Sequence, residues 1–288
     1  MRLAITGTQG RVGRALADRL GKTFEVHELD RGNFDLSAPD LGKRLSRLDF
    51  DLLLHPAAMT SLEACEDDPE LARRINAEAP GELAKVCRLS GRGMVHFSTD
   101  YVLAGDVPGL HDEDFRVEPI SVYGESKLGG ERRVLDEGGC VMRVSWVFGP
   151  ERPAFPDQVI TRALAGEPLM AVADKTSLPT FTRDLAEWVG AGLETGFPND
   201  VLHACNGGEP VSWHGMALEV VECLLEEGRL KVRPVVETQK LDEISAFRAA
   251  RPRHTAMATG KLSDLIGSQP RNWREALREY VFECLISR

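Results

Sequence analysis

The stretch that decides the fold is Arg2-Leu-Ala-Ile-Thr-Gly-Thr-Gln-Gly-Arg-Val-Gly13, at the start of the chain. Residues 2–6 form a short, largely apolar run, and Gly7, Gly10 and Gly13 follow it. Residues 12–20 then repeat apolar side chains with the period of a helix. Strand, glycine-rich turn and helix, in this order, are the context that a dinucleotide-binding fingerprint requires. The N-terminus therefore predicts the first βα unit of a parallel sheet.

The glycines in this turn suit a phosphate ligand. They allow a sharp turn and leave space for a pyrophosphate, while the helix N-terminus offers N–H groups and a partial positive charge. The spacing is Gly-x-x-Gly-x-x-Gly instead of Gly-x-Gly-x-x-Gly, so a glycine turn that binds no ligand stays open.

A second apolar segment, 24–29, ends at Asp30, where an acid that binds ribose is expected. A carboxylate there accepts hydrogen bonds from the ribose hydroxyls and repels a 2′-phosphate, which favours NADH. Arg31 follows at once and is able to pair with a 2′-phosphate. NADH and NADPH both stay open as the cofactor.

Tyr123 and Lys127 lie four residues apart, which on a helix places both side chains on one face. A lysine ammonium beside a phenol favours the phenolate, so we expect Lys127 to lower the pKa of Tyr123. Such a tyrosine exchanges a proton with a carbonyl or an alcohol. The alternative is a half-buried tyrosine beside a solvated lysine on a surface helix.

Strands and helices alternate through the first half of the chain, which predicts an α/β fold of the Rossmann type, a doubly wound parallel sheet. Further strands are expected at 50–55, 94–98 and 140–147, with helices at 38–47 and 69–90, the latter kinked at Pro80, and a helix around Tyr123. In the second half we expect helices at 155–166, 182–194, 212–227 and 272–286, and strands near 169–173, 201–205 and 232–236. The predicted domains are 1–150, a dinucleotide-binding domain that also takes in about 182–206, and 151–288, mainly a smaller α/β substrate-binding domain.

Useful residue types fall at or just past the ends of the predicted strands. They are Gly7, Asp30, Pro56, Thr99 and Trp146. In a doubly wound sheet, ligands bind beyond the carboxyl ends of the strands. The sequence therefore predicts one crevice that collects these residues.

Composition narrows the class of partner. The chain has 288 residues, 42% hydrophobic and 28% charged, with a formal net charge of −10. This charge argues against nucleic acid or an anionic membrane as a partner, and no apolar run reaches the length of a membrane span. The six cysteines include no Cys-x-x-Cys pair, which predicts reduced thiols, no metal site and a cytoplasmic location.

Several longer motifs carry a resemblance that covers nearly the whole chain. They are Thr6–Gly13, Phe34–Leu36, Pro56–Thr60, Ser98-Thr-Asp-Tyr-Val102, Val122-Tyr-Gly-Glu-Ser-Lys-Leu-Gly-Gly-Glu131, Arg143–Gly149, Pro179-Thr180 with Asp184–Ala186, and Arg251-Pro252. In this order they resemble the extended short-chain dehydrogenase/reductases and, within them, the dTDP-4-dehydrorhamnose reductase family. The resemblance implies NADPH- or NADH-dependent reduction of the C4 keto group of a 6-deoxy nucleotide-sugar, most simply dTDP-4-dehydrorhamnose to dTDP-L-rhamnose.

The resemblance also implies roles for individual residues. Thr99, Tyr123 and Lys127 would be the catalytic set, with Tyr123 as the proton donor. The cofactor would contact Gly7, Gly10, Arg11, Val12, Gly13, Asp30, Asp35, Leu36, Ala58, Met59, Thr60, Phe97, Tyr123 and Lys127. The sugar would contact Thr99, Asp100 and Trp146, although the Trp146 ring is also of a type that fills a core.

Departures from the family pattern fall mainly on the substrate side. The segment 174–180 has Asp-Lys where the family usually has Asp-Gln, and residues 251–255 end in His-Thr instead of Asn-Ser. Ala64 and Met59 also replace usual residues. The identity of the sugar and its carrier therefore stays open.

Two other functions stay open with the same fold. One is an epimerase or dehydratase that retains NAD, and the other is a cofactor-binding regulatory subunit without catalysis. A homodimer is an assembly that the resemblance also leaves open.

Overall fold

The computed structural model describes residues 1–286. Its largest feature is a six-stranded parallel sheet with the strand order β2-β1-β3-β4-β5-β8. The strands are β1 (Arg2–Thr6), β2 (Glu25–Leu29), β3 (Leu52–His55), β4 (Gly93–Thr99), β5 (Cys140–Val144) and β8 (Val201–His203). The predicted α/β class is confirmed.

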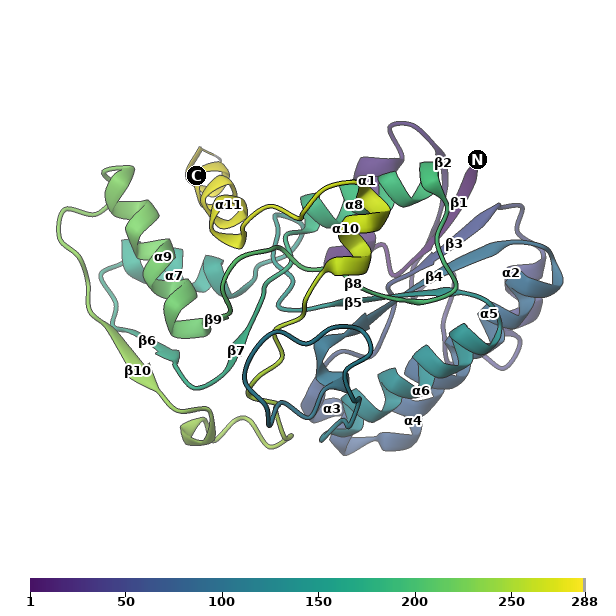
Figure 1. The fold of residues 1–288 in the computed structure, drawn as a ribbon, viewed down its shortest axis with the longest axis horizontal. Helices are drawn as coiled ribbons and strands as arrows, with labels where there is room; N and C mark the ends of the chain where they lie inside the picture. Colours follow the sequence, from purple (N-terminus) through teal and green to yellow (C-terminus); the bar gives the residue numbers. More distant parts are fainter. Residues whose placement is uncertain (287–288) are drawn as a thin grey trace.

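Helices cover both faces of this sheet (Figure 1). One face carries α1 (Arg11–Leu20), α8 (Thr182–Thr195) and α10 (Gly260–Ile266), and the other carries α2 (Leu41–Ser46), α5 (Ala79–Leu89) and α6 (Val122–Asp136). In β1, Leu3 and Ile5 pack into the first layer and Ala4 into the second. Burial on both faces explains why the central strands are apolar runs without alternation.

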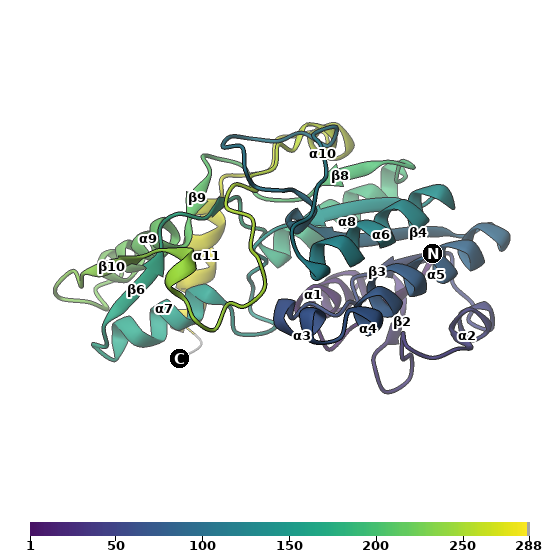
Figure 2. The same ribbon diagram turned by 90° about the horizontal axis from the view of Figure 1, so that it is seen from below.

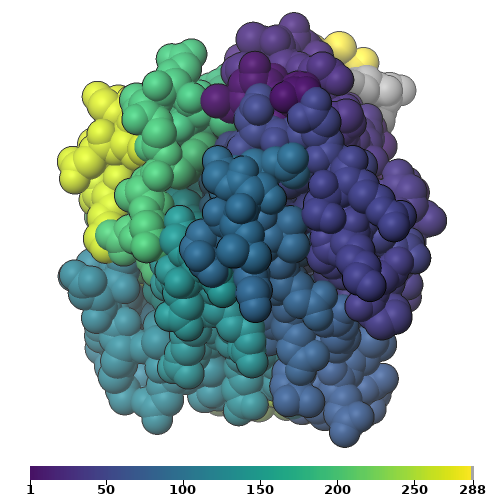
Figure 3. Space-filling view, turned by 90° about the vertical axis from the view of Figure 1, so that its right-hand side faces the viewer, coloured from purple at the N-terminus to yellow at the C-terminus, as the bar shows by residue number. Residues whose placement is uncertain are grey.

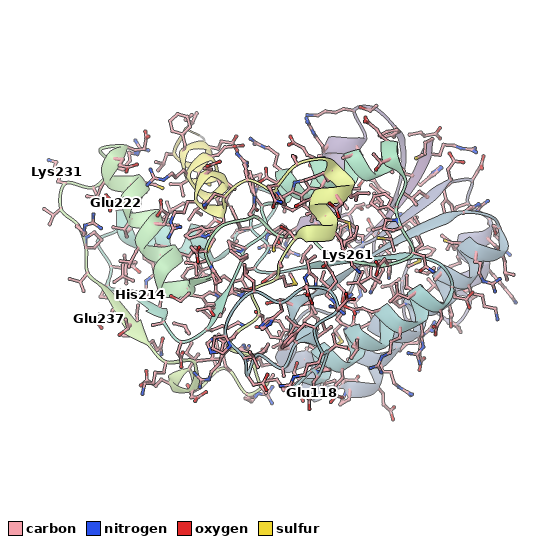
Figure 4. The ribbon with its side chains drawn as sticks, in the orientation of Figure 1. Glu118, His214, Glu222, Lys231, Glu237 and Lys261 are labelled. Carbon is pink, nitrogen blue, oxygen red and sulfur yellow. The ribbon has the colours of Figure 1, made fainter. Side chains whose placement is uncertain are left out.

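A second, smaller unit lies beside the carboxyl ends of the strands (Figures 1 and 2). It contains α7 (Phe155–Leu164), α9 (Trp213–Glu226), α11 (Trp273–Ile286), the parallel pair β6 (Leu169–Val172) and β10 (Val236–Gln239), and the antiparallel pair β7 (Thr176–Ser177) and β9 (Val211–Ser212). His214, near the start of α9, hydrogen-bonds the Val236 carbonyl at 3.0 Å and so ties α9 to β10 (Figure 4). The first half of the chain covers most of the opposite end of the molecule, and green and yellow segments of the second half lie at its left side (Figure 3).

The chain crosses between the two units more than once. After α7 and β6 it returns to the large sheet with α8 and β8, and α10 later packs on α8. The predicted boundaries at 150 and 182–206 are compatible with this path and stay a prediction.

Some predicted elements differ from the structure. The helix predicted at 69–90 runs without a gap from Pro69 to Leu89, but it contains a π-helical turn: α4 (Pro69–Arg73), η1 (Arg74–Glu78) and α5. Pro80 has no N–H to donate to the carbonyl four residues earlier, which interrupts the ladder where the kink was expected.

The strand predicted at 140–147 was too long. It ends at Val144, because Ser145 and Phe148 donate their N–H groups to Thr180 instead of to the sheet. The strand expected near 232–236 begins at Val236. The helices α3 (Leu62–Asp67) and α10, the short turns η2 (Asp100–Val102) and η3 (Leu241–Glu243), and the strands β7 and β9 were not predicted.

Candidate active site

A cavity of about 1060 Å³ lies at the carboxyl ends of β1 to β5. It opens where the strand order reverses between β1 and β3, the usual ligand position in such sheets. Its size lies at the upper end of the roughly 300–1,000 Å³ of small-molecule pockets. Every residue predicted to bind cofactor or substrate lines it: Gly7, Gly10, Arg11, Val12, Gly13, Asp30, Asp35, Leu36, Ala58, Met59, Thr60, Phe97, Thr99, Asp100, Tyr123, Lys127 and Trp146.

The glycine turn forms one end of this cavity and fits a pyrophosphate. Gly7 has a φ of +62°, and a Cβ on Gly13 would lie 2.2 Å from the Gly7 carbonyl oxygen. Helix α1 has no side-chain cap, so its first N–H groups, on Arg11 and Val12, lack acceptors within the helix. Close backbone approach and N–H groups at a helix N-terminus suit a phosphate group.

Arg11 uses its side chain differently from the expected phosphate contact. Its guanidinium donates to the carbonyls of Val147 (3.0 Å), Arg152 (3.3 Å) and Pro153 (2.7 Å). These carbonyls belong to the segment after β5, which also lines the cavity. Arg11 thus ties the glycine turn to the opposite wall, and its main-chain N–H is the group left to meet a phosphate.

Hydrogen bonds fix the position of the Asp30 carboxylate at the end of β2. Its carboxylate accepts the N–H groups of Gly32 (2.7 Å) and Asn33 (3.1 Å) and the Gln9 side chain (2.9 Å). The hydrogen bonds from Asn33 and Gly32 hold the pKa of Asp30 below its ordinary value. A carboxylate fixed in this way fits a ribose hydroxyl.

The loop after β3 is held by a residue that the sequence reading missed. Asn76, fully buried in η1, accepts the Met59 N–H (2.8 Å) and donates to the Met59 carbonyl (3.0 Å) and to Ser126 of α6 (3.0 Å). The sequence feature that could have identified Asn76 is its position next to Ile75, on the apolar side of the predicted helix. Asn76 therefore joins the 58–60 loop to the helix that carries Tyr123.

Tyr123 and Lys127 lie one turn apart on the buried face of α6, and Thr99 ends β4 beside them. Burial raises the pKa of Tyr123, and a hydrogen-bonding interaction with the Thr99 side chain opposes this rise in part. Lys127 does not lower the pKa of Tyr123 as we expected, because its ammonium points to the sheet: Nζ donates to the Phe97 carbonyl at 2.7 Å. Burial lowers the pKa of Lys127 itself to about 7. At neutral pH Tyr123 is thus a protonated phenol, the form that donates a proton.

Asp100 and Trp146 join the cavity to the smaller unit. Asp100 is almost fully buried and accepts hydrogen bonds from Thr99 (3.2 Å), Ser177 (3.4 Å) and Thr255 (2.5 Å). Trp146 has a left-handed φ of +43°, and its Nε1 is buried without a hydrogen-bond partner among the described residues. Strain and an unsatisfied donor at a cavity wall are features of functional positions.

Lys175, at the position where the family usually has glutamine, is a second residue that the sequence reading did not assign. Its side chain is fully buried, donates to the Pro252 carbonyl at 2.5 Å and lies 4.8 Å from the centre of the Tyr101 ring. Burial lowers the pKa of Lys175 to about 8. An ammonium thus stands behind an aromatic wall of the cavity.

Within residues 1–286 no group of three or more His, Cys, Asp or Glu side chains is arranged to hold a metal ion, and the absence of a metal stays a prediction. No helix in that range is long and apolar enough to cross a bilayer.

The glycine turn, the acid after β2 and the Tyr-Lys pair, gathered around one cavity, define an extended short-chain dehydrogenase/reductase. Comparison with known proteins narrows this class. The family model described as "RmlD substrate binding domain" matches residues 1–286, and the chain belongs to that family.

Named relatives align over most of the chain. A probable dTDP-4,6-dihydroxy-2-methyloxan-3-one 4-ketoreductase of Streptomyces antibioticus is 35% identical, over 97% of this chain and 94% of that protein. The dTDP-4-dehydrorhamnose reductase of Mycolicibacterium smegmatis is 32% identical, over 97% of this chain and 85% of its own length. The crystal structure of dTDP-4-dehydrorhamnose reductase from Bacillus anthracis in complex with NADP superposes with a TM-score of 0.87 at 27% identity, over 98% of this chain and 99% of the other.

Proposed function

We propose that this chain catalyses the NAD(P)H-dependent reduction of the C4 keto group of a 6-deoxy nucleotide-sugar, most simply dTDP-4-dehydrorhamnose to dTDP-L-rhamnose. The observation that carries the proposal is the single cavity, in which the glycine turn lies at one end and Tyr123, Lys127 and Thr99 form a wall. Relatives with at least 30% identity that are named as 4-keto reductases support it.

The reaction adds a hydride to C4 and a proton to the C4 oxygen. A bound reduced nicotinamide supplies the hydride. Tyr123 donates the proton, because burial keeps its hydroxyl protonated at neutral pH. Thr99 turns its O–H from Asp100 to the same oxygen and polarises it, while the Lys127 ammonium holds the cofactor ribose and adds positive charge.

The cofactor groove extends from the glycine turn to this wall. We assign the pyrophosphate to Gly10, Arg11 and Val12 through their main chain, the adenosine ribose to Asp30 and the adenine to Asp35 and Leu36. Ala58, Met59, Thr60 and Phe97 cover the remainder. Asp100 and Trp146 face the sugar.

A different 4-keto sugar is the second candidate substrate. The Streptomyces antibioticus relative, at 35% identity, is named for such a sugar. Lys175 also places a buried ammonium behind Tyr101, where the family usually has a neutral glutamine. Both observations concern the substrate side and leave the reduction itself unchanged.

The test is oxidation of NADH and NADPH by the purified chain with dTDP-4-keto-6-deoxy sugars, with identification of the product. We expect turnover with at least one of these sugars. Failure with all of them would reject the reductase. NAD that co-purifies through extensive dialysis would instead favour an epimerase or dehydratase, and a stable partner enzyme without turnover would favour a regulatory subunit.

We further place this activity in the cytoplasm and leave a homodimer open as its assembly. A reducing compartment is supported by the sequence, in which the six cysteines are scattered without a Cys-x-x-Cys pair.

A further inference from the structure

Among the described residues, the side chain that hydrogen-bonds Lys127 is His96, on strand β4 of the sheet. The Lys127 side chain is 1% exposed, so its hydrogen bonds to the protein matter for its position. Its Nζ lies 2.7 Å from the Phe97 carbonyl oxygen and 3.1 Å from His96 Nε2. Glu131, one turn further along α6, is engaged by Arg143 at 2.9 and 2.8 Å. Glu131 supports the ammonium through its charge, and His96 is the side chain within hydrogen-bond distance of it.

The hydrogen bond fixes the protonation state of His96. An ammonium only donates, so while Lys127 is charged Nε2 accepts and the ring proton lies on Nδ1, which has no hydrogen-bond partner among the described residues. Burial and the charge of Lys127 hold the pKa of His96 well below its ordinary value. The ring is therefore a neutral acceptor throughout the physiological pH range.

His55 supports the same arrangement from the neighbouring strand. Its ring stacks on that of His96 with 5.2 Å between centroids, and its Nδ1 lies 2.8 Å from the Thr6 hydroxyl. Burial, with a smaller contribution from Lys127, lowers the pKa of His55 to about 3. The titratable groups that act on Lys127 are thus Glu131 on its own helix and these two neutral histidines on β4 and β3, while Tyr123 lies one turn before it.

We propose that His96 is a positioning residue for the reductase: by accepting a hydrogen bond at Nε2, it fixes the Lys127 ammonium one turn from Tyr123. This inference rests on the function proposed above for its kinetic consequences. Its structural content, the acceptor nitrogen, can be measured without turnover.

The kinetic test compares two amides at the same position. In His96→Gln the amide reaches the place of Nε2 and retains an acceptor for Lys127. In His96→Asn it reaches only the place of Nδ1. A hydrogen bond to a charged group contributes about 1.5–3 kcal/mol, so we expect His96→Asn to lose about 10- to 100-fold in NADH or NADPH affinity and in kcat/KM, and His96→Gln to lose little.

The pH dependence of kcat/KM distinguishes a role of His96 in positioning Lys127 from a role in the stability of the fold alone. Without its acceptor the buried ammonium is less stable, so Lys127 loses its proton at lower pH. The basic limb of kcat/KM should therefore move to lower pH in His96→Asn and stay in place in His96→Gln. Equal profiles in two folded variants, as judged by thermal melting, would overturn the proposal.

A spectroscopic measurement keeps the proposal testable if His96→Asn does not fold. In protein labelled with ¹⁵N-histidine, the His96 signals are assigned by their loss in His96→Gln. At about pH 6, where Lys127 is charged, we expect Nε2 to resonate as an unprotonated acceptor, whereas a free imidazole is largely protonated at that pH. A proton on Nε2 would contradict the inference. This result is independent of the substrate, so it stands even if no nucleotide-sugar is reduced.

Discussion

Replacement of Gly13 by alanine tests how closely the first turn must approach helix α1. The new Cβ would lie 2.2 Å from the Gly7 carbonyl oxygen, 2.6 Å from the Gly7 carbonyl carbon and 2.9 Å from the Thr6 carbonyl oxygen. Ordinary contact requires more than about 3 Å, so the helix start must move by about 1 Å. Because all three atoms are backbone, no side chain can rotate away. We expect a loss of about 1–3 kcal/mol in the free energy of unfolding, the usual cost of overpacking.

The same shift should weaken cofactor binding. It moves the first N–H groups of α1 away from a pyrophosphate, and each hydrogen bond to a charged group that is lost lowers the affinity by about tenfold or more. Gly190→Ala is the matched control, because its Cβ would meet only the Leu20 side chain, at 4.0 Å, inside helix α8. Alanine there should stabilise the chain by up to about 1 kcal/mol.

Thermal melting and titration of NADH or NADPH fluorescence measure both effects for this pair. A Gly13→Ala protein that melts and binds like the wild type would refute the close approach of strand, turn and helix. A Gly190→Ala protein that loses as much as Gly13→Ala would refute the reasoning from Cβ contacts.

Three other variants test the site and its support. Glu131→Gln should lower the free energy of urea unfolding by about 3–5 kcal/mol, because it leaves the Arg143 guanidinium buried without its counter-charge. Its control, Glu137→Gln, breaks a partly exposed pair and should cost less than about 1 kcal/mol. Equal costs in the two variants would contradict this reasoning. Burial lowers the pKa of Lys127 from 10.5 to about 7, so between these values the unfolded state binds more protons and stability rises with pH, by up to about 1.4 kcal/mol per unit. Urea unfolding of Lys127→Met should show a shallower rise, and an unchanged slope would contradict the burial. Asp30→Asn removes a negative charge beside the expected ribose, so kcat/KM for NADPH should rise severalfold relative to that for NADH, and an unchanged ratio would remove Asp30 from the cofactor site.

Much of the fold could be predicted because it depends on short-range signals. The run 2–6, the glycine turn and the apolar segments fix strands and helices locally, and parallel topology then brings the strand ends together. Thr99, for example, ends β4, and Tyr123 follows on the next long helix.

The remaining features depend on contacts between residues far apart in the sequence. The Arg11 side chain hydrogen-bonds the carbonyl of Val147, 136 residues away in the sequence, and no local sequence pattern predicts such a bond. The pKa of Tyr123 rises because tertiary packing buries it, which the four-residue spacing from Lys127 does not reveal. His55 and His96 each stand in an apolar strand, and only the register of β3 with β4 pairs them.

The direct measurement is the rate of hydride transfer in a single turnover, compared between the wild type and Tyr123→Phe. Each protein is saturated with its preferred reduced cofactor and mixed with an excess of the 4-keto nucleotide-sugar, and loss of cofactor absorbance is followed. If Tyr123 delivers the proton, the rate should fall about 10²- to 10⁴-fold in the variant. Equal rates in the two proteins would contradict the assignment of Tyr123 as the proton donor.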